Sequence, residues 1–240
     1  MIATTPSGTN VEFNRAGAGP AVVVIAANFS ASDAGYMDAL TPRFTVVEVS
    51  PRGYRGSFRP SEDAEFRLED LREDVEAAAD ACEIQRFSVW GYSLTAGMAL
   101  YVARTSSRVD AVVAGGFPVV TPLAYQMTAA YFRNVWAAGP GDPDLPFRPA
   151  TVLRYYEAMA EWLANADLSH LPARRIAYFG TKDSVLGMLD GFEDNVKRLR
   201  SHGFTVRAFD GLDHDACAGN RVEPVVAVVG EIVLPPVHPR

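Results

Sequence analysis

The sequence lacks the features of secreted and membrane-spanning proteins. Its two cysteines, Cys82 and Cys217, are too few for a disulfide framework, so we expect reduced thiols. Residues 1–15 show no basic start followed by an apolar core, and no signal peptide is therefore expected. The longest apolar run, Ala21–Ala27, is far shorter than the roughly 20 residues that cross a bilayer.

Basic residues are also too few for a protein that binds nucleic acid. The 22 Lys and Arg residues are outnumbered by 29 Asp and Glu residues, which gives a net charge of −7. Such a surface repels phosphate backbones, and no long basic run offsets this. We expect a cytoplasmic monomer or homodimer that acts on a small molecule and has neither a nucleic acid nor a membrane as partner.

Motifs for metals and nucleotides are missing as well. No His, Cys and Asp residues have the spacing of zinc ligands. Neither G-x-G-x-x-G at a strand–helix turn nor G-x-x-x-x-G-K-[ST] occurs, and Gly17–Gly19 precedes a strand rather than a helix. We therefore expect no metal and no cofactor.

Strand-like and helix-like segments alternate along most of the chain. Continuous β-branched runs are typical of strands buried on both faces of a parallel sheet. Such runs alternate with helical stretches such as Phe66–Cys82 and Leu94–Arg104. The pattern predicts an α/β fold, with a mostly parallel central β-sheet and helices on both faces. The expected strands are 11–13, 21–26, 44–49, 86–90, 110–115, 175–179 and 205–209, and later helices are expected at 187–202 and 222–233.

The alternation is interrupted once. Residues 118–170 hold aromatic helical stretches on either side of the breaker segment 139–143. We interpret this block as a small helical insertion over the carboxyl edge of the sheet. The core domain is then formed by residues 1–117 and 171–240.

Ser93 stands at the turn between an expected strand and an expected helix. Ligands of open parallel sheets bind at the carboxyl ends of the strands, which is where this turn lies. A serine on such a sharp turn projects its hydroxyl outward, and Gly91 and Gly97 let the two backbones pass closely. A helix N-cap is the alternative role for this serine. The buried strand, the helix and the flanking glycines together favour a nucleophile.

Four histidines are candidates for the base that a serine nucleophile needs. His214 follows the expected strand 205–209, and this places it on the same edge of the sheet as Ser93. His238 lies in a proline-rich tail, His202 ends a charged helix, and His170 has no evident orienting partner. We therefore assign the general base to His214.

A base of this kind needs a carboxylate that fixes its tautomer. Asp183 follows the expected strand 175–179 and lies on the required edge. Asp213 and Asp215 flank His214 directly, and residues so close in the chain are better explained as shaping the loop. No acidic residue follows the expected strand that ends at Gly115. Asp183 is the predicted acid.

The order Ser…Asp…His at the ends of three strands resembles the α/β-hydrolase superfamily. Pro51–Ser57 is similar to the arginine–glycine loop of that family, and Gly180–Asp183 and Gly211–His214 are similar to its acid and histidine loops. The resemblance implies a cofactor-independent serine hydrolase that forms an acyl-enzyme on Ser93. It also implies that residues 118–170 are the family's variable cap.

Two positions depart from the family pattern. Thr95 stands two residues after the serine, where the family usually has glycine, and a β-branched side chain there needs extra room or a shifted helix. The loop after the expected strand 21–26 has Asn28 at the usual glycine. The resemblance implies an oxyanion hole formed by the backbone N–H groups of Phe29 and Leu94, with the Asn28 amide as an alternative donor.

The insertion is rich in aromatic side chains, most of which we expect to pack the cap onto the core. Some are expected to line an apolar pocket, which favours an ester, thioester or lactone with a small apolar or aromatic acyl or alcohol group. Fold alone does not separate such an esterase from a lactonase, C–C hydrolase, perhydrolase, cofactor-free lyase or non-catalytic binding protein. A dehalogenase or epoxide hydrolase is disfavoured, because those members have Asp in place of Ser93. The expected pocket residues are Tyr92, Tyr125, Phe132, Trp136 and Tyr155.

Overall fold

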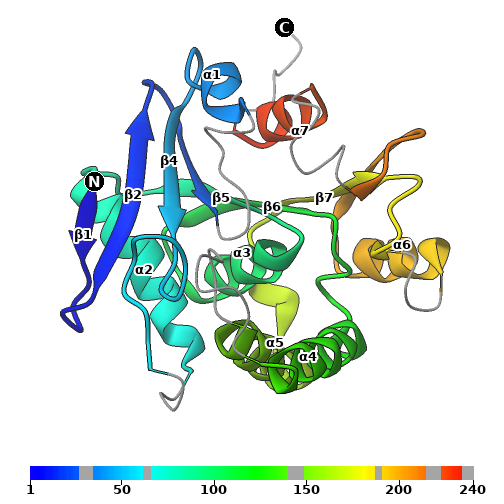
Figure 1. Cartoon of the computed structure of the whole chain (residues 1–240). Helices are drawn as coiled ribbons and strands as arrows, with labels where there is room; N and C mark the ends of the chain where they lie inside the picture. The colour runs from blue at the N-terminus through cyan, green and yellow to red at the C-terminus, as the bar shows by residue number, and fades with distance from the viewer. Residues whose placement is uncertain (27–34, 62–65, 140–148, 187–190, 215–222, 234–240) are drawn as a thin grey trace, which may run out of the picture.

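The computed structural model describes residues 1–26, 35–61, 66–139, 149–186, 191–214 and 223–233. Its centre is an eight-stranded sheet in the order β1-β2-β4-β3-β5-β6-β7-β8 (Figure 1). The pairs β1–β2 and β2–β4 are antiparallel, and every other pair is parallel. The strands are β1 (Ile2–Thr4), β2 (Asn10–Ala16), β3 (Ala21–Ile25), β4 (Thr45–Ser50), β5 (Phe87–Tyr92), β6 (Val109–Gly115), β7 (Arg174–Gly180) and β8 (Thr205–Phe209).

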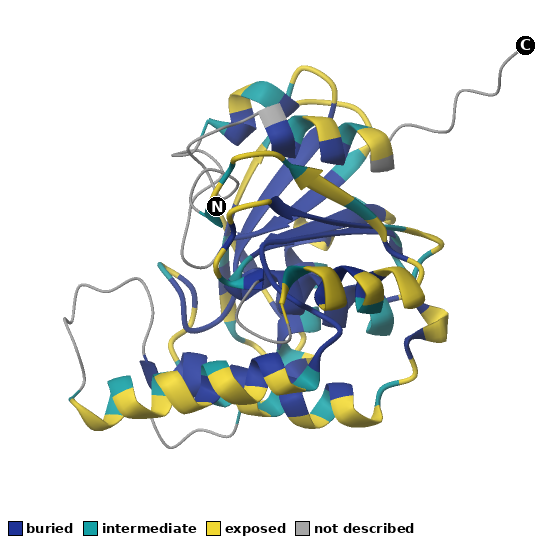
Figure 2. Ribbon diagram, turned by 90° about the vertical axis from the view of Figure 1, so that its right-hand side faces the viewer, coloured by how far each residue is buried: buried dark blue, intermediate teal, exposed yellow. Residues whose placement is uncertain are grey.

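Helices cover both faces of the sheet, as the sequence predicted. One buried cluster joins one face to α2, α3 and α6, and a second joins the other face to α1 and α7. Figure 2 shows the buried strands between these layers. The helices are α1 (Tyr36–Leu40), α2 (Leu68–Ala81), α3 (Leu94–Thr105), α4 (Pro122–Ala137), α5 (Pro149–Asn165), α6 (Phe192–Ser201) and α7 (Glu223–Val233).

Helices α4 and α5 pack against each other and lie beyond α3, on the side of the sheet away from α1 and α7 (Figures 1 and 2). They come from the segment that interrupts the strand–helix alternation. Their inner faces belong to the same buried cluster as α3, whereas their outer faces are exposed. Within the described residues, no helix is both long and apolar enough to cross a membrane.

The loop after β4 is anchored to α2 by buried charges. The Arg52 guanidinium lies 2.8 Å from a carboxylate oxygen of Asp70 and 2.8 Å from one of Asp74. The backbone N–H of Arg52 also donates to Asp74, at 2.8 Å. Burial raises the pKa of Asp74, and the ion pair with Arg52 opposes this rise. The arginine–glycine segment, Pro51–Ser57, is therefore held against α2 by the ion pairs of Arg52.

Candidate active site

Ser93 occupies a sharp turn between β5 and α3. Its backbone angles, φ 53° and ψ −115°, are unfavourable for a residue with a side chain, so the surrounding structure must hold them. The backbone N–H of Ser93 donates to the Gly115 carbonyl at 2.8 Å, which ties the turn to β6. A Cβ atom on Gly91 would lie 2.1 Å from the Thr95 carbonyl oxygen. The close approach of strand and helix is present at Gly91. At Gly97 a Cβ would instead meet the hydroxyls of Tyr155 and Tyr125, at 2.4 and 2.6 Å, so this glycine makes room for α4 and α5 rather than for β5.

Thr95, which departs from the family pattern, stabilises this turn. Its hydroxyl accepts a hydrogen bond from the Tyr92 N–H at 3.0 Å and donates one to the Tyr92 carbonyl at 3.1 Å. The Thr95 side chain is fully buried. The β-branched residue thus fits because its hydroxyl satisfies two backbone groups at the end of β5, a reason that the sequence analysis did not anticipate.

The side chains of Ser93, His214 and Asp183 form one hydrogen-bonded chain. His214 Nε2 lies 2.9 Å from Ser93 Oγ, and His214 Nδ1 lies 3.0 Å from both carboxylate oxygens of Asp183. Asp183 Oδ1 also accepts the backbone N–H groups of Val185 (2.9 Å) and Leu186 (3.3 Å), which fixes the carboxylate. The Asp183 side chain is fully buried, whereas 21% of the His214 side chain is exposed. This arrangement can take a proton from the Ser93 hydroxyl and stabilise the resulting imidazolium.

Tyr92 lies elsewhere than the sequence analysis placed it. It is fully buried and belongs to the core cluster on the α1 and α7 face, opposite the face where α4 and α5 lie. Its hydroxyl donates to the His214 carbonyl at 2.8 Å and lies 3.4 Å from Asp183 Oδ2. The alternation of side chains along a strand predicts this position, because Trp90 and Tyr92 lie two residues apart in β5 and must share a face of the sheet. The position of Tyr92 behind His214 and Asp183 therefore argues against the predicted pocket role.

The other expected pocket residues are distributed between the core and the half-buried surface. Tyr125 and Tyr155 are fully buried, and both hydroxyls lie against Gly97 of α3. Phe132 and Trp136 are half-buried and pack on the same core. The rings of Phe117, Tyr125, Phe132, Tyr155 and Tyr156 form an aromatic cluster with centroid separations of 4.9 to 6.0 Å. The aromatic cluster joins α4 and α5 to the core, as expected for most aromatic residues of the insertion.

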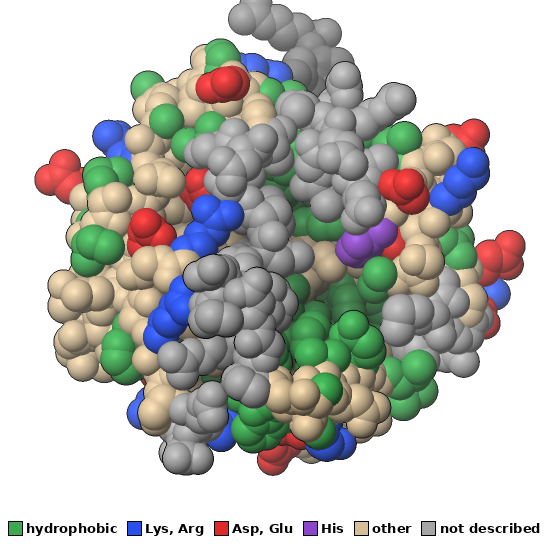
Figure 3. All heavy atoms as spheres, in the orientation of Figure 1, with side chains coloured by type: hydrophobic (Ala, Val, Ile, Leu, Met, Phe, Trp, Pro, Cys, Tyr) green, Lys and Arg blue, Asp and Glu red, His purple; other side chains and the backbone are tan. Residues whose placement is uncertain are grey.

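One stripe of α4 is apolar and exposed. Leu123, Met127 and Tyr131 are spaced one helical turn apart, and their exposed fractions are 48%, 41% and 63%. In the space-filling view, hydrophobic side chains gather above α4 around a hollow in the molecular surface (Figure 3). An apolar ligand could lie against such a surface.

The predicted oxyanion donors are described only in part. Leu94 is the first residue of α3 and directly follows Ser93. Phe29 and Asn28 lie outside the described residues. In the part of the chain that the structure describes, no group of three or more His, Cys, Asp or Glu side chains could hold a metal ion.

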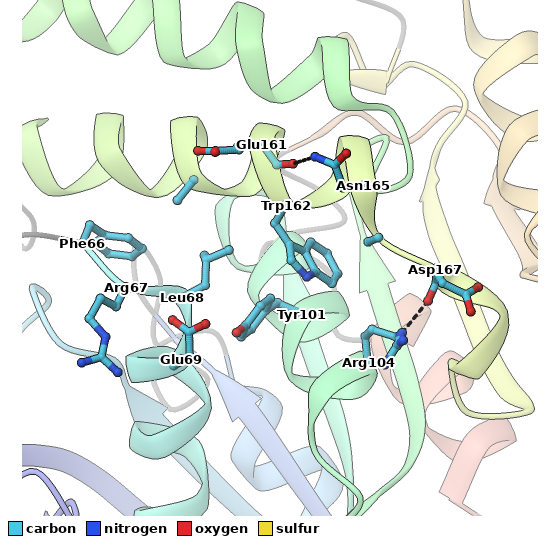
Figure 4. Close-up of a pocket in the computed structure, with 12 residues that line it drawn as sticks. Phe66, Arg67, Leu68, Glu69, Tyr101, Arg104, Glu161, Trp162, Asn165 and Asp167 are labelled. Carbon is cyan, nitrogen blue, oxygen red and sulfur yellow. Dashed lines mark hydrogen bonds between the residues drawn. The ribbon is translucent and has the colours of Figure 1, made fainter.

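A separate groove of about 690 Å³ lies between the start of α2, the second half of α3 and the end of α5 (Figure 4). Tyr101 and Trp162 face each other in it, with ring centroids 5.0 Å apart. Tyr101 lies eight residues beyond Ser93, about 12 Å along the helix axis. The groove is therefore distinct from the site around Ser93.

Comparisons with known proteins agree with this architecture. A family model described as the alpha/beta hydrolase fold matches residues 20–214. A search of curated proteins finds no match. Among solved structures, a malate-bound esterase from Thermogutta terrifontis superposes with a TM-score of 0.75 at 17% identity, over 96% of both chains.

Two further solved structures carry different activities in their names. A variant epoxide hydrolase from Bacillus megaterium has a TM-score of 0.70 at 13% identity, over 97% of this chain and 99% of its own. A variant meta-cleavage product hydrolase from Pseudomonas fluorescens IP01 has a TM-score of 0.64 at 20% identity, over 96% of this chain and 97% of its own. At these identities the likeness shows the fold alone.

Proposed function

The chain belongs to the α/β-hydrolase fold family, and we propose that it is a serine hydrolase that cleaves small apolar or aromatic carboxylic esters, thioesters or lactones. The observation that carries this proposal is the hydrogen-bonded chain from Ser93 through His214 to Asp183. These three residues come from distant parts of the sequence. Ligand binding alone does not require such an alignment, whereas nucleophilic catalysis does.

In the proposed mechanism, Ser93 Oγ attacks the acyl carbonyl carbon while His214 Nε2 takes the hydroxyl proton. Asp183 orients the imidazole and stabilises its positive charge. The carbonyl oxygen becomes an oxyanion, which the backbone N–H groups of Leu94 and Phe29 would bind. The positive end of the α3 dipole favours the same charge. His214 then returns the proton to the leaving group, and the acyl group remains on Ser93.

Water completes the cycle. His214 takes a proton from water, whose oxygen attacks the acyl-enzyme carbonyl carbon. Collapse of this second intermediate breaks the bond between the acyl carbon and Ser93 Oγ, to which His214 returns its proton, and the carboxylic acid is released. All proton transfers thus use one imidazole.

The preference for apolar substrates follows from the surface around α4. We propose that α4 and α5 act as the cap, and that the exposed Leu123 and Met127 contact the apolar part of the substrate. The aromatic cluster fills the space between these helices and α3. This packing favours small substrates over long-chain ones.

Turnover of model esters tests the proposal. We expect hydrolysis of p-nitrophenyl acetate and butyrate by the wild-type protein and a loss of at least about 1000-fold in kcat for Ser93→Ala. Ser201→Ala is the matched control, because Ser201 is exposed at the end of α6. Equal turnover by Ser93→Ala and Ser201→Ala would exclude an acyl-serine mechanism. Binding of these esters without turnover by the wild type would favour a binding protein.

A further inference from the structure

A buried tyrosine contacts both partners of the proposed nucleophile. The Tyr92 hydroxyl donates to the His214 backbone carbonyl at 2.8 Å and lies 3.4 Å from Asp183 Oδ2. The Tyr92 ring lies 5.1 Å from the His214 ring, centroid to centroid. Tyr92 is also the residue that precedes Ser93 in the chain. One side chain therefore connects the segments that supply nucleophile, acid and base.

The end of β6 is shaped to admit this ring. A Cβ atom on Gly115 would lie 2.4 Å from Tyr92 Cδ2, and one on Gly116 would lie 2.4 Å from Cζ and 2.6 Å from the hydroxyl oxygen. Side chains at these two positions would displace the tyrosine. The same Cβ on Gly115 would also lie 2.4 Å from Tyr178 Cε1, so Gly115 makes room for both rings and Gly116 makes room for Tyr92.

The backbone of Tyr92 is fixed independently of its side chain. Its N–H and carbonyl groups both bond to the Thr95 hydroxyl. The phenol group therefore extends from a fixed backbone at the end of β5, and its hydroxyl donates to the His214 carbonyl. His214 lies five residues beyond the end of β8 at Phe209, and the Tyr92 hydroxyl bonds directly to its backbone carbonyl.

We propose that Tyr92 is a positioning residue, which holds His214 and Asp183 in register with Ser93. This inference rests on the proposed serine hydrolase function. The side chain of Tyr92 contacts His214 and Asp183, so it acts through these two residues. A displacement of the imidazole by a fraction of an ångström weakens proton transfer, because reacting groups must be aligned in advance.

The test removes the hydroxyl alone. Tyr92→Phe keeps the ring in its space and deletes the hydrogen bond to His214. We expect about a tenfold fall in kcat on p-nitrophenyl acetate with an unchanged KM, and an equal fall in the rate at which a fluorophosphonate labels Ser93. The far-downfield proton resonance of the His214–Asp183 hydrogen bond should shift or broaden.

Tyr178→Phe is the matched control. Tyr178 is fully buried beside Tyr92, with ring centroids 5.5 Å apart, and its hydroxyl accepts a hydrogen bond from Trp90 Nε1 at 3.1 Å. This variant also loses a buried hydroxyl in the same core cluster. We expect it to retain the wild-type kcat, labelling rate and proton resonance.

The outcomes separate this inference from the proposed function. Normal labelling of the wild type with equal kinetics in Tyr92→Phe and Tyr178→Phe would overturn the positioning role alone. A Tyr92→Phe protein that fails to fold where Tyr178→Phe folds would assign the hydroxyl to stability and also overturn it. If the wild-type protein neither reacts with the fluorophosphonate nor hydrolyses esters, both the proposed function and the positioning role are contradicted.

Discussion

The replacement of Thr95 by valine tests how the turn at Ser93 is held. Valine has nearly the same shape as threonine but no hydroxyl. In Thr95→Val the Tyr92 N–H and carbonyl groups therefore lose partners at 3.0 and 3.1 Å in a fully buried position. An intramolecular hydrogen bond contributes about 0.5–1.5 kcal/mol net to stability. For the two bonds lost we expect a decrease of about 1–3 kcal/mol in the free energy of unfolding.

Thr95→Ser separates the hydroxyl from the shape of the side chain. It keeps both hydrogen bonds and removes only a methyl group, which costs about 1 kcal/mol in a core. Urea denaturation of the three proteins measures the difference, and fluorophosphonate labelling reports whether Ser93 stays reactive. We expect the valine variant to be less stable than the serine variant and to label more slowly. Equal stability of the two variants would refute the claim that the hydroxyl holds the turn.

Three further predictions concern the core. Asp74→Ala should lower the free energy of unfolding by about 3–5 kcal/mol, because it leaves the buried Arg52 guanidinium without its main partner. Arg86→Ala breaks only an exposed ion pair and should leave the midpoint of urea denaturation nearly unchanged. Gly91→Ala should unfold the protein or destabilise it severely, since the new Cβ would lie 2.1 Å from a carbonyl oxygen. Gly230→Ala in α7 should be neutral or slightly stabilising in the same assay, because its Cβ would meet Arg43 Nη1 at an ordinary contact distance of 4.0 Å. Burial raises the pKa of all three tyrosines of the aromatic cluster, so the neutral form is favoured in the folded state. Their contribution to stability should therefore be present below about pH 10 and lost as the pH rises above it; phenolate absorbance from these residues before unfolding would contradict this.

The positions of the residues that follow the parallel strands could be predicted from the sequence. The parallel strands β5, β7 and β8 all have their carboxyl ends at one edge of the sheet. Ser93, Asp183 and His214 follow these strands, so topology places all three at that edge of the sheet. Expected strand limits were close to those observed because β-branched runs mark buried parallel strands clearly.

Features that depend on short segments or on side-chain direction were not predicted. Neither β1 nor α1 was predicted, since three and five residues give too little periodicity. It began one helix at Phe66, but α2 begins at Leu68, because Arg67 is extended with φ −114° and ψ 126°. The expected helix 187–202 is observed from Phe192 to Ser201, and residues 187–190 lie outside the described residues. Residue types alone did not reveal that the Tyr92 side chain reaches the His214 carbonyl.

In the proposed mechanism, Ser93 is a nucleophile that His214 activates. Reaction with a fluorophosphonate, followed by mass spectrometry to locate the adduct, tests it most directly, because this reagent modifies only an activated serine. We expect one adduct, on Ser93, that is absent from His214→Ala and from Ser93→Ala. An adduct on another residue, or none where a control hydrolase reacts, would contradict it.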